Sequence, residues 1–334
     1  MLTALFVTLR IVANPLSNVF QKQLTSRGAH PLVVIAVTHA LLTPVAAALL
    51  ATVRWQDLDS VFWMNMVLCA VLAVVGNALL VYALKKGDLS LLGPINAYKS
   101  VLSLVLAVVL LGEIPSTAGA VGVVLVLVGS LFVVDRAPGQ AHGRALLQFI
   151  RDRGVQLRLA ALVFSATEAV FLKRAILHST PLTTFLFWSI LGLPFALIAV
   201  AALGRNDGES RARQLAANVR LYLGLALTTG LMQAATLFTF GKLQVGYSLA
   251  LFQLSTLVSV FLGHHLFREK NIRRRLIGSL IMVAGAALIV SLGRSKPENP
   301  VQADVFLPLG KSVDSKGRGC ADPLNGSGIH LHAV

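Results

Sequence analysis

The chain has 334 residues, of which 56% are hydrophobic and 13% are charged, and its formal net charge at pH 7 is +15. Soluble domains carry about 25% charged residues, so this composition excludes an ordinary soluble protein and predicts a membrane protein. The basic residues stand in short clusters between apolar runs, so we expect lipid headgroups rather than nucleic acid as their partner.

The sequence contains about ten apolar runs, each near the roughly 20 residues that a helix needs to cross the hydrocarbon core. The lipid interior offers unpaired backbone groups no partner, so such runs without strand-like alternation predict helices. The predicted fold class is an all-α polytopic membrane protein. In chain order the predicted spans are 2–22, 31–53, 62–84, 89–111, 115–134, 159–177, 181–203, 221–241, 246–267 and 275–292.

A repeated pattern divides these spans into two halves. At an offset of about 156 residues, several residues of the first half match their own type in the second half, and Asn77 falls on Gln233. Five spans per half is an odd number, so the second copy must cross the membrane in the opposite direction, which predicts two inverted five-helix repeats. The matching pairs are Lys86 and Lys242, Ser103 and Ser259, Glu113 and Glu269, Gly122 and Gly278, and Gly129 and Gly285.

The repeats are predicted at residues 1–134 and 159–292, with a connecting loop between them and a tail after them. The connecting loop, 135–158, interleaves arginines with large apolar residues. This pattern fits a short amphipathic helix on the headgroups and a solvated linker equally well. The tail, 293–334, is rich in Gly, Pro, Ser and Asn with scattered charges, so it is predicted to be disordered.

The positions of lysine and arginine predict the orientation, because cytoplasmic loops carry the positive excess. Most basic residues outside the tail lie in the loops after the odd-numbered spans. This distribution places both termini outside the cytoplasm. The loops on the opposite side hold only Arg54, Lys173, Arg174 and Lys242.

Two stretches carry a resemblance to a known family. In each, a helix ends close to a glutamate, a short turn follows, and the last helix is dotted with glycines. This pattern resembles the EamA-type half of the drug/metabolite transporter superfamily. The stretches are Gly93-Pro94-Ile95-Asn96 through Leu111-Gly112-Glu113-Ile114-Pro115 with Gly122 and Gly129, and Phe267-Arg268-Glu269-Lys270 with Gly278 and Gly285.

The resemblance covers about residues 1–292. It implies a ten-helix transporter with a central substrate cavity between two inverted five-helix bundles, located as a multi-pass protein in the cell (plasma or inner) membrane. Members of the family are commonly drawn with both termini in the cytoplasm, which is the opposite of the orientation that the charges indicate. Glu113 is expected to cap a helix or pair with a basic residue rather than to act in catalysis.

Charged residues inside the spans mark the candidate site, because a charge at mid-bilayer costs about 2.5 to 3.5 kcal/mol even on a lenient scale. Arg10, Lys99 and Glu168 qualify. They form either a substrate or proton site or an internal ion pair that only fixes helix packing. Two bases against one acid favour an anionic or zwitterionic substrate, with Lys99 or Arg10 binding its carboxylate or phosphate. Glu168 is also the candidate for coupling transport to a proton or another ion.

Uncharged polar residues complete the predicted substrate site: Asn14, Asn77, Asn96, Gln233 and Gln253. Asn77 and Gln233 occupy equivalent places in the two halves, and Asn96 and Gln253 differ by one residue. Such positions are expected to line a pseudo-symmetric cavity, although a hydrogen bond between helices explains each residue equally well.

Two further residues affect this interpretation. Ala13-Asn14 followed by Lys22 resembles the first span of the small multidrug-resistance proteins, but Asn14 stands where they carry a proton-binding glutamate. An amide cannot titrate, so antiport of cationic drugs by that mechanism is not expected. Pro94 breaks or caps a helix inside the fourth span and can free carbonyl groups towards a cavity.

The leading hypothesis is a secondary transporter of small organic metabolites, amino-acid-like or anionic, working as an exporter or exchanger by alternating access. The alternatives are a nucleotide-sugar or phosphate-ester exchanger, and a membrane scaffold that transports nothing. The sequence has no phosphate-binding loop, nucleophile elbow or metal-binding histidine pair. We therefore expect neither a nucleotide-driven motor nor an enzyme, and predict no cofactor and no metal.

Overall fold

The structure, a computed structural model, is helical throughout the part of the chain that it describes, with no strand in that part. Among the described residues, six helices are long and apolar enough to cross a membrane, and two shorter apolar helices accompany them. The all-α membrane fold is thus confirmed. The expected number of ten spans depends partly on residues outside the described part. Glu113 and the tail also lie outside it. The described residues are 2–99, 101–102, 116–133, 142–203, 208–243 and 245–292.

The first repeat contains three long helices, a broken helix and a final apolar helix. Its third helix begins where the carboxylate of Asp59 accepts a hydrogen bond from the Phe62 amide at 2.7 Å, as a helix N-cap does. The bounds are Leu2–Ser26 for α1, Pro31–Ala48 for α2, Leu50–Thr52 for η1, Trp55–Asp57 for η2, Ser60–Lys86 for α3, Leu89–Leu92 for α4, Pro94–Ala97 for η3 and Thr117–Val133 for α6.

The second repeat follows the same order after a short connecting helix, α7. The segment between the repeats is thus helical in its described part, and its binding to headgroups stays a prediction. The bounds are His142–Arg151 for α7, Arg153–Leu177 for α8, Pro181–Leu203 for α9, Gly208–Ala217 for α10, Val219–Lys242 for α11, Val245–Phe252 for α12, Ser255–Phe267 for α13 and Ile272–Leu292 for α14.

The fourth apolar run of each repeat is broken within its described residues. The break at Pro94 in the run 89–111 was predicted, whereas the break in the run 246–267 was not. In the first repeat, α4 ends at Leu92 and a 3-10 turn follows from Pro94, which has no N–H to continue the helix. The corresponding run of the second repeat, 246–267, contains no proline. There the amides of Leu254 and Thr256 donate to carbonyls three residues back, which winds the chain more tightly than an α-helix.

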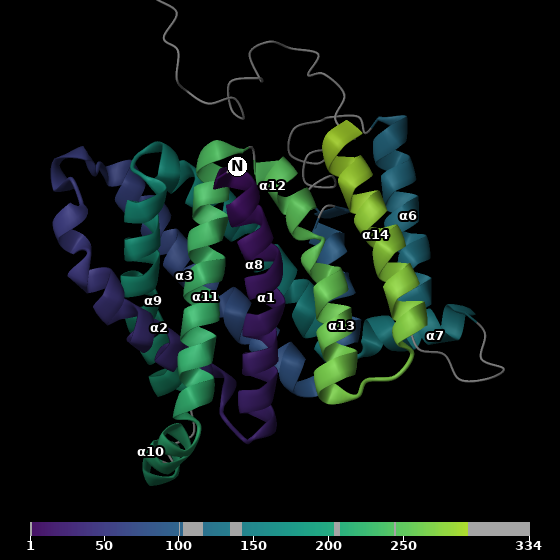
Figure 1. Ribbon diagram of the computed structural model, residues 1–334, viewed down its shortest axis with the longest axis horizontal. Coiled ribbons are helices and arrows are strands. Elements are labelled where there is room, and N and C mark those ends of the chain that lie inside the picture. Colours follow the sequence, from purple (N-terminus) through teal and green to yellow (C-terminus); the bar gives the residue numbers. More distant parts are fainter. Residues whose placement is uncertain are drawn as a thin grey trace, which may run out of the picture. The chain divides into compact units, whose positions relative to one another are not determined.

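The helices pack in pairs, and each pair contains one helix from each repeat. The first helix of each repeat packs against the third helix of the other, so α1 lies beside α11 and α3 beside α8 (Figure 1). The second helices, α2 and α9, pack together, and so do the last helices, α6 and α14. A reciprocal exchange of this kind is the pattern that a two-fold axis produces.

The contact between α6 and α14 shows that equivalent helices run in opposite directions. A Cβ atom added to Gly122 would lie 2.7 Å from the Gly285 carbonyl oxygen, and one added to Gly129 would lie 2.8 Å from that of Gly278. The earlier glycine of one helix therefore contacts the later glycine of the other, which makes the pair antiparallel. Glycines at these places let the two backbones touch, as small residues do between membrane helices.

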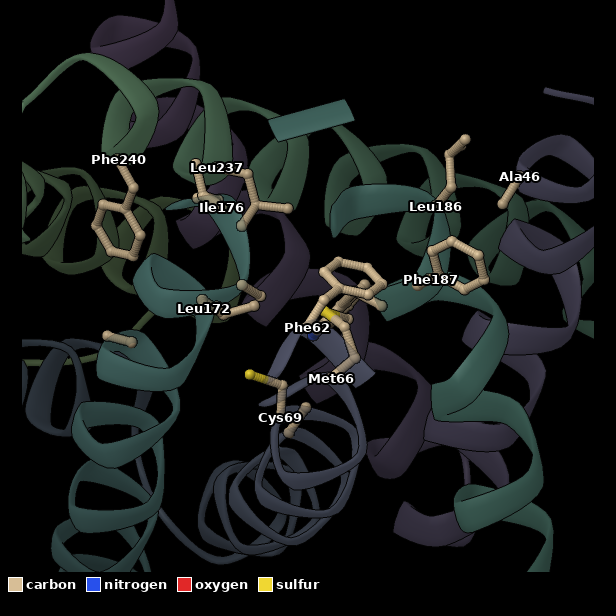
Figure 2. Close-up of a cluster of buried hydrophobic side chains, with 14 of the residues drawn as sticks. Ala46, Phe62, Met66, Cys69, Leu172, Ile176, Leu186, Phe187, Leu237 and Phe240 are labelled. Carbon is tan, nitrogen blue, oxygen red and sulfur yellow. The ribbon is translucent and has the colours of Figure 1, made fainter. Parts of the chain in front are cut away.

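An apolar cluster joins helices of both repeats next to the polar region described below. Figure 2 shows Phe62, Met66 and Cys69 of α3 gathered with side chains of α8, α9 and α11. The rings of Phe62 and Phe187 meet edge to face, with centroids 5.6 Å apart. Because the cluster draws on both repeats, it fixes the helices that carry the polar residues.

We predict that Gly285→Val destabilises the protein. The new Cβ would lie 2.6 Å from the Gly122 carbonyl oxygen, which is backbone and cannot rotate away. Overpacking of this kind costs about 1 to 3 kcal/mol, so thermal unfolding in detergent should begin at a lower temperature. Ala284→Val, one position away on the exposed side of α14, is the matched control and should unfold like the wild type. Equal melting temperatures for both variants would contradict the close helix contact.

Candidate functional site

A polar cavity of about 130 Å³ lies where the two repeats meet. Its described lining comes from α1, α3 and η3 of the first repeat and from α8, α9, α11 and α12 of the second. Pockets for drug-sized ligands measure roughly 300 to 1,000 Å³, so a cavity of this size fits only a small solute. The structure brings all eight predicted residues together in this lining: Arg10, Asn14, Asn77, Asn96, Lys99, Glu168, Gln233 and Gln253.

Arg10 reaches the cavity from the middle of α1. Its Nε donates to the hydroxyl of Thr236 on α11 at 2.7 Å, and its guanidinium lies 5.0 Å from the ring centroid of Phe252. Its Nη1 is buried without a hydrogen-bond partner among the described residues. One strong donor of this arginine is therefore available to a ligand.

Lys99 and Glu168 line the same cavity and are each held by a neutral group. The Nζ of Lys99 donates to the Ser165 carbonyl at 3.0 Å. Oε1 of Glu168 accepts a hydrogen bond from the indole nitrogen of Trp188 at 3.0 Å. Trp188 also lines the cavity, and its hydrogen bond orients the one carboxylate of the described lining.

The amide side chains connect the two broken helices. Asn96 of η3 donates to Gln253, which follows α12, at 3.2 Å, so the two breaks meet at the cavity. Asn14 donates to Ser255 at 3.4 Å. Gln233 is 6% exposed, and its Nε2 has no partner in the described part of the chain.

Arg158 belongs to this site although the sequence placed it in the connecting loop. Helix α8 begins at Arg153, not near residue 159, because the Asp152 carboxylate accepts from the Val155 amide at 3.0 Å and caps it. Arg158 is therefore inside the helix and only 8% exposed. An aspartate at the N-cap position was the signal in the sequence that could have revealed the longer helix.

The partners of Arg158 are the groups that the break in the fourth helix sets free. Its Nη2 donates to Oδ1 of Asn96 at 3.0 Å, and its Nε donates to the Leu92 carbonyl at 3.3 Å. In a continuous helix the Leu92 carbonyl would accept from the Asn96 amide, but that amide bonds to Gly93 instead. The break at Pro94 thus frees the Leu92 carbonyl as predicted, and that carbonyl accepts a hydrogen bond from Arg158 of the cavity lining.

A second polar cluster lies beyond one end of the cavity, around Glu269 in the loop between α13 and α14. Its carboxylate accepts hydrogen bonds from the amides of Leu89 and Ser90, both at 2.8 Å, and from the Ser90 hydroxyl. It also pairs with Lys22 of α1 at 2.7 Å and with Arg275 at 3.6 Å. We call these five residues the Glu269 cluster.

The Glu269 cluster joins the two repeats. Glu269 caps α4 of the other repeat and pairs with Lys22. Its counterpart by the repeat offset, Glu113, lies outside the described residues, so the cap or base pair expected there stays a prediction. Burial raises the pKa of Glu269, but the hydrogen bonds from Lys22 and Ser90 outweigh this and leave it below its ordinary value.

The chain is similar to a known family over most of its length. The model of the EamA-like transporter family matches residues 2–135 and 152–291, which is most of the chain. No curated protein matches the chain closely enough to count as a relative. A solved crystal structure, described only as that of a protein, is similar with 18% sequence identity and a TM-score of 0.50, and the match covers 86% of this chain and 95% of that chain. At this identity the likeness concerns the fold alone.

We predict that Glu269→Gln destabilises the protein in a pH-dependent way. Removing one partner of a buried ion pair costs about 3 to 5 kcal/mol, because it leaves the other charge uncompensated. The pKa of Glu269 is lower in the folded protein than its ordinary 4.5, so its stabilising charge is fully present above that pH and is lost below it. The difference in melting temperature from the wild type should be largest near neutral pH and shrink below about pH 4.5.

The matched control is Asp57→Asn, which removes an exposed carboxylate from the short turn before α3. It should melt like the wild type at every pH. A Glu269→Gln variant as stable as the wild type near neutral pH would show that the cluster does not hold the repeats together.

Proposed function

We propose that this chain, which belongs to the EamA-like transporter family, is a secondary transporter that moves small organic metabolites across the cell (plasma or inner) membrane by alternating access. The family and the apolar helices make it a multi-pass membrane protein. The single observation that carries the proposal is the polar cavity at the meeting point of the two repeats. Its chemistry suits an amino-acid-like or anionic solute, and Arg10, Lys99 and Glu168 are the residues we expect to bind it.

The proposed mechanism uses two bundles of five helices that cross the bilayer in opposite directions. The antiparallel contact of α6 with α14 and the reciprocal pairing of the other helices support this arrangement. Broken helices in equivalent places, with side chains of both breaks in the cavity, support a binding site near mid-membrane. Rocking of one bundle against the other would then expose the same site to each side in turn.

The Glu269 cluster gives the proposed motion a contact that must break. Lys22, Leu89 and Ser90 belong to the first repeat and Glu269 to the second, so their bonds hold the repeats together at one end. The structure described here therefore fits the conformer in which that end is shut. Opening it requires the carboxylate to leave these donors.

The cavity volume favours small metabolites over nucleotide sugars. At about 130 Å³ the cavity is below the size range of drug-sized ligands, and a nucleotide sugar is at least as large as these. In a non-transporting scaffold these costly charges would only fix helix packing. The buried donors Arg10 Nη1 and Gln233 Nε2, which have no partner among the described residues, favour a binding site instead. The small cavity volume and the polar groups of its lining therefore favour transport of a small solute over both alternatives.

We predict that Lys99→Ala and Glu168→Gln each reduce solute flux into liposomes by about 10- to 100-fold. A hydrogen bond to a charged group contributes about 1.5 to 3 kcal/mol, and this is the corresponding loss in binding. Both variants should still elute as folded protein in detergent. Lys242→Ala, which changes an exposed lysine in the last turn of α11, is the control and should keep wild-type flux. Wild-type flux in both site variants would remove the site assignment.

We also predict that a reporter fused after residue 145 gives a cytoplasmic signal and one fused after residue 334 does not. Arg158 and Arg275 are buried and no longer count towards the loop charges. The remaining basic residues after the odd-numbered spans still outnumber those on the opposite side. On this orientation the Glu269 cluster lies at the cytoplasmic end. A cytoplasmic signal at residue 334 would reverse the assignment and place the cluster at the outer end.

A further inference from the structure

We infer that the cavity selects an organic dianion, a small solute that carries either two carboxylates or one phosphate monoester. The inference rests on the proposed function for the transport of this solute, and on the contacts of Arg10, Arg158 and Gln233 for its charge. It narrows the range of anionic and zwitterionic solutes that the sequence left open.

The charged side chains around the cavity carry more positive than negative charge. The basic side chains of its described lining are Arg10, Lys99 and Arg158, and the acidic one is Glu168. One carboxylate can balance one of these bases. The described lining therefore has an excess of two positive charges.

The two arginines donate their hydrogen bonds to neutral groups. Arg10 donates to a threonine hydroxyl and lies over the ring of Phe252. Arg158 donates to a backbone carbonyl and to the amide oxygen of Asn96. In the part of the chain that the structure describes, neither guanidinium is within 4.0 Å of a carboxylate. The hydrogen bonds of both guanidinium groups within the described residues therefore go to neutral acceptors.

Two buried donors of the cavity lining have no acceptor among the described residues. Nη1 of Arg10 and Nε2 of Gln233 are buried, and neither has a partner among the described residues. Gln233 precedes Thr236, the partner of Arg10, by three positions on α11, so both lie on the same face of that helix. Two donors that face one cavity without an acceptor indicate a ligand that brings acceptor oxygens.

Leaving these charges unbalanced inside the protein costs free energy. Taking an ion out of water costs several kcal/mol, and an opposite charge at close range is what offsets that cost. A cation or a zwitterion would leave both excess charges in place, and a monocarboxylate would leave one. A solute with two negative charges balances the cavity, and carboxylate or phosphate oxygens match the fork of a guanidinium.

The test compares solutes of matched size and different charge, with the full chain in detergent and in liposomes at pH 7.5. The dianions are malonate, succinate and glycerol 3-phosphate. Monomethyl succinate supplies nearly the same shape with one charge fewer, alanine is the zwitterion and choline the cation. We expect at least one dianion to raise the melting temperature and to compete for binding about tenfold or more better than monomethyl succinate. The dicarboxylates and the phosphate ester are separate arms that identify the source of the charge.

The variants test whether Arg158 sets this preference. Arg158→Gln keeps a hydrogen-bond donor and removes the charge, so we expect dianion affinity to fall about 10- to 100-fold and monomethyl succinate affinity to change much less. Arg158→Lys should keep the preference. Arg174→Gln removes an exposed arginine near the end of the same helix and is the control. If Arg158→Gln does not fold, Arg10→Gln makes the same comparison.

The outcomes separate this inference from the proposed function. Flux of alanine or monomethyl succinate without preference for any dianion would overturn the inference and leave the transporter. Binding of a dianion without flux of any solute would support the inference and overturn the transporter. A panel in which no dianion binds, or an Arg158→Gln variant with unchanged charge preference, would overturn the inference.

Discussion

The structure depends on one constraint, which is that the hydrocarbon interior supplies no partner for a polar group. Arg10, Lys99, Arg158 and Glu168 are carried on otherwise apolar helices, and the structure brings all of them to the surface that the two repeats share. Exposed positions on two of these helices include large apolar side chains, such as Leu5 and Val12 of α1 and Val163 and Val170 of α8. The site is therefore a result of the same physical rule as the fold, because the contact between the repeats is the place in the membrane where charged groups find acceptors.

The broken helices illustrate how tightly fold and site are linked. A break in a membrane helix frees backbone groups that would be costly in lipid, so it must lie where protein side chains can satisfy them. Here the Leu92 carbonyl is met by Arg158, and the side chains of Asn96 and Gln253 meet each other. Both contacts join the first repeat to the second, so the breaks also help to hold the two repeats together.

Much of the fold and part of the site could be predicted from the sequence. Arg10, Lys99 and Glu168 were visible because a charge inside an apolar run is conspicuous, and the offset of the repeats paired Asn77 with Gln233. Arg158 was missed because the polar first turns of α8 extend past the apolar run, where hydropathy gives no signal. The break before α13 was also missed, since no proline marks it and only local hydrogen bonds reveal it.

The partners of Glu269 could not be predicted for a different reason. A local pattern can suggest that a carboxylate caps a nearby helix, but Glu269 caps one about 180 residues away. Its cluster also has a consequence for symmetry. By the offset of the repeats, the counterpart of Arg275 is Gly119, which has no side chain to donate a hydrogen bond. The two ends of the carrier are thus chemically unequal, and we expect the resting protein to favour the conformer shut at the Glu269 end even though its halves descend from one duplicated unit.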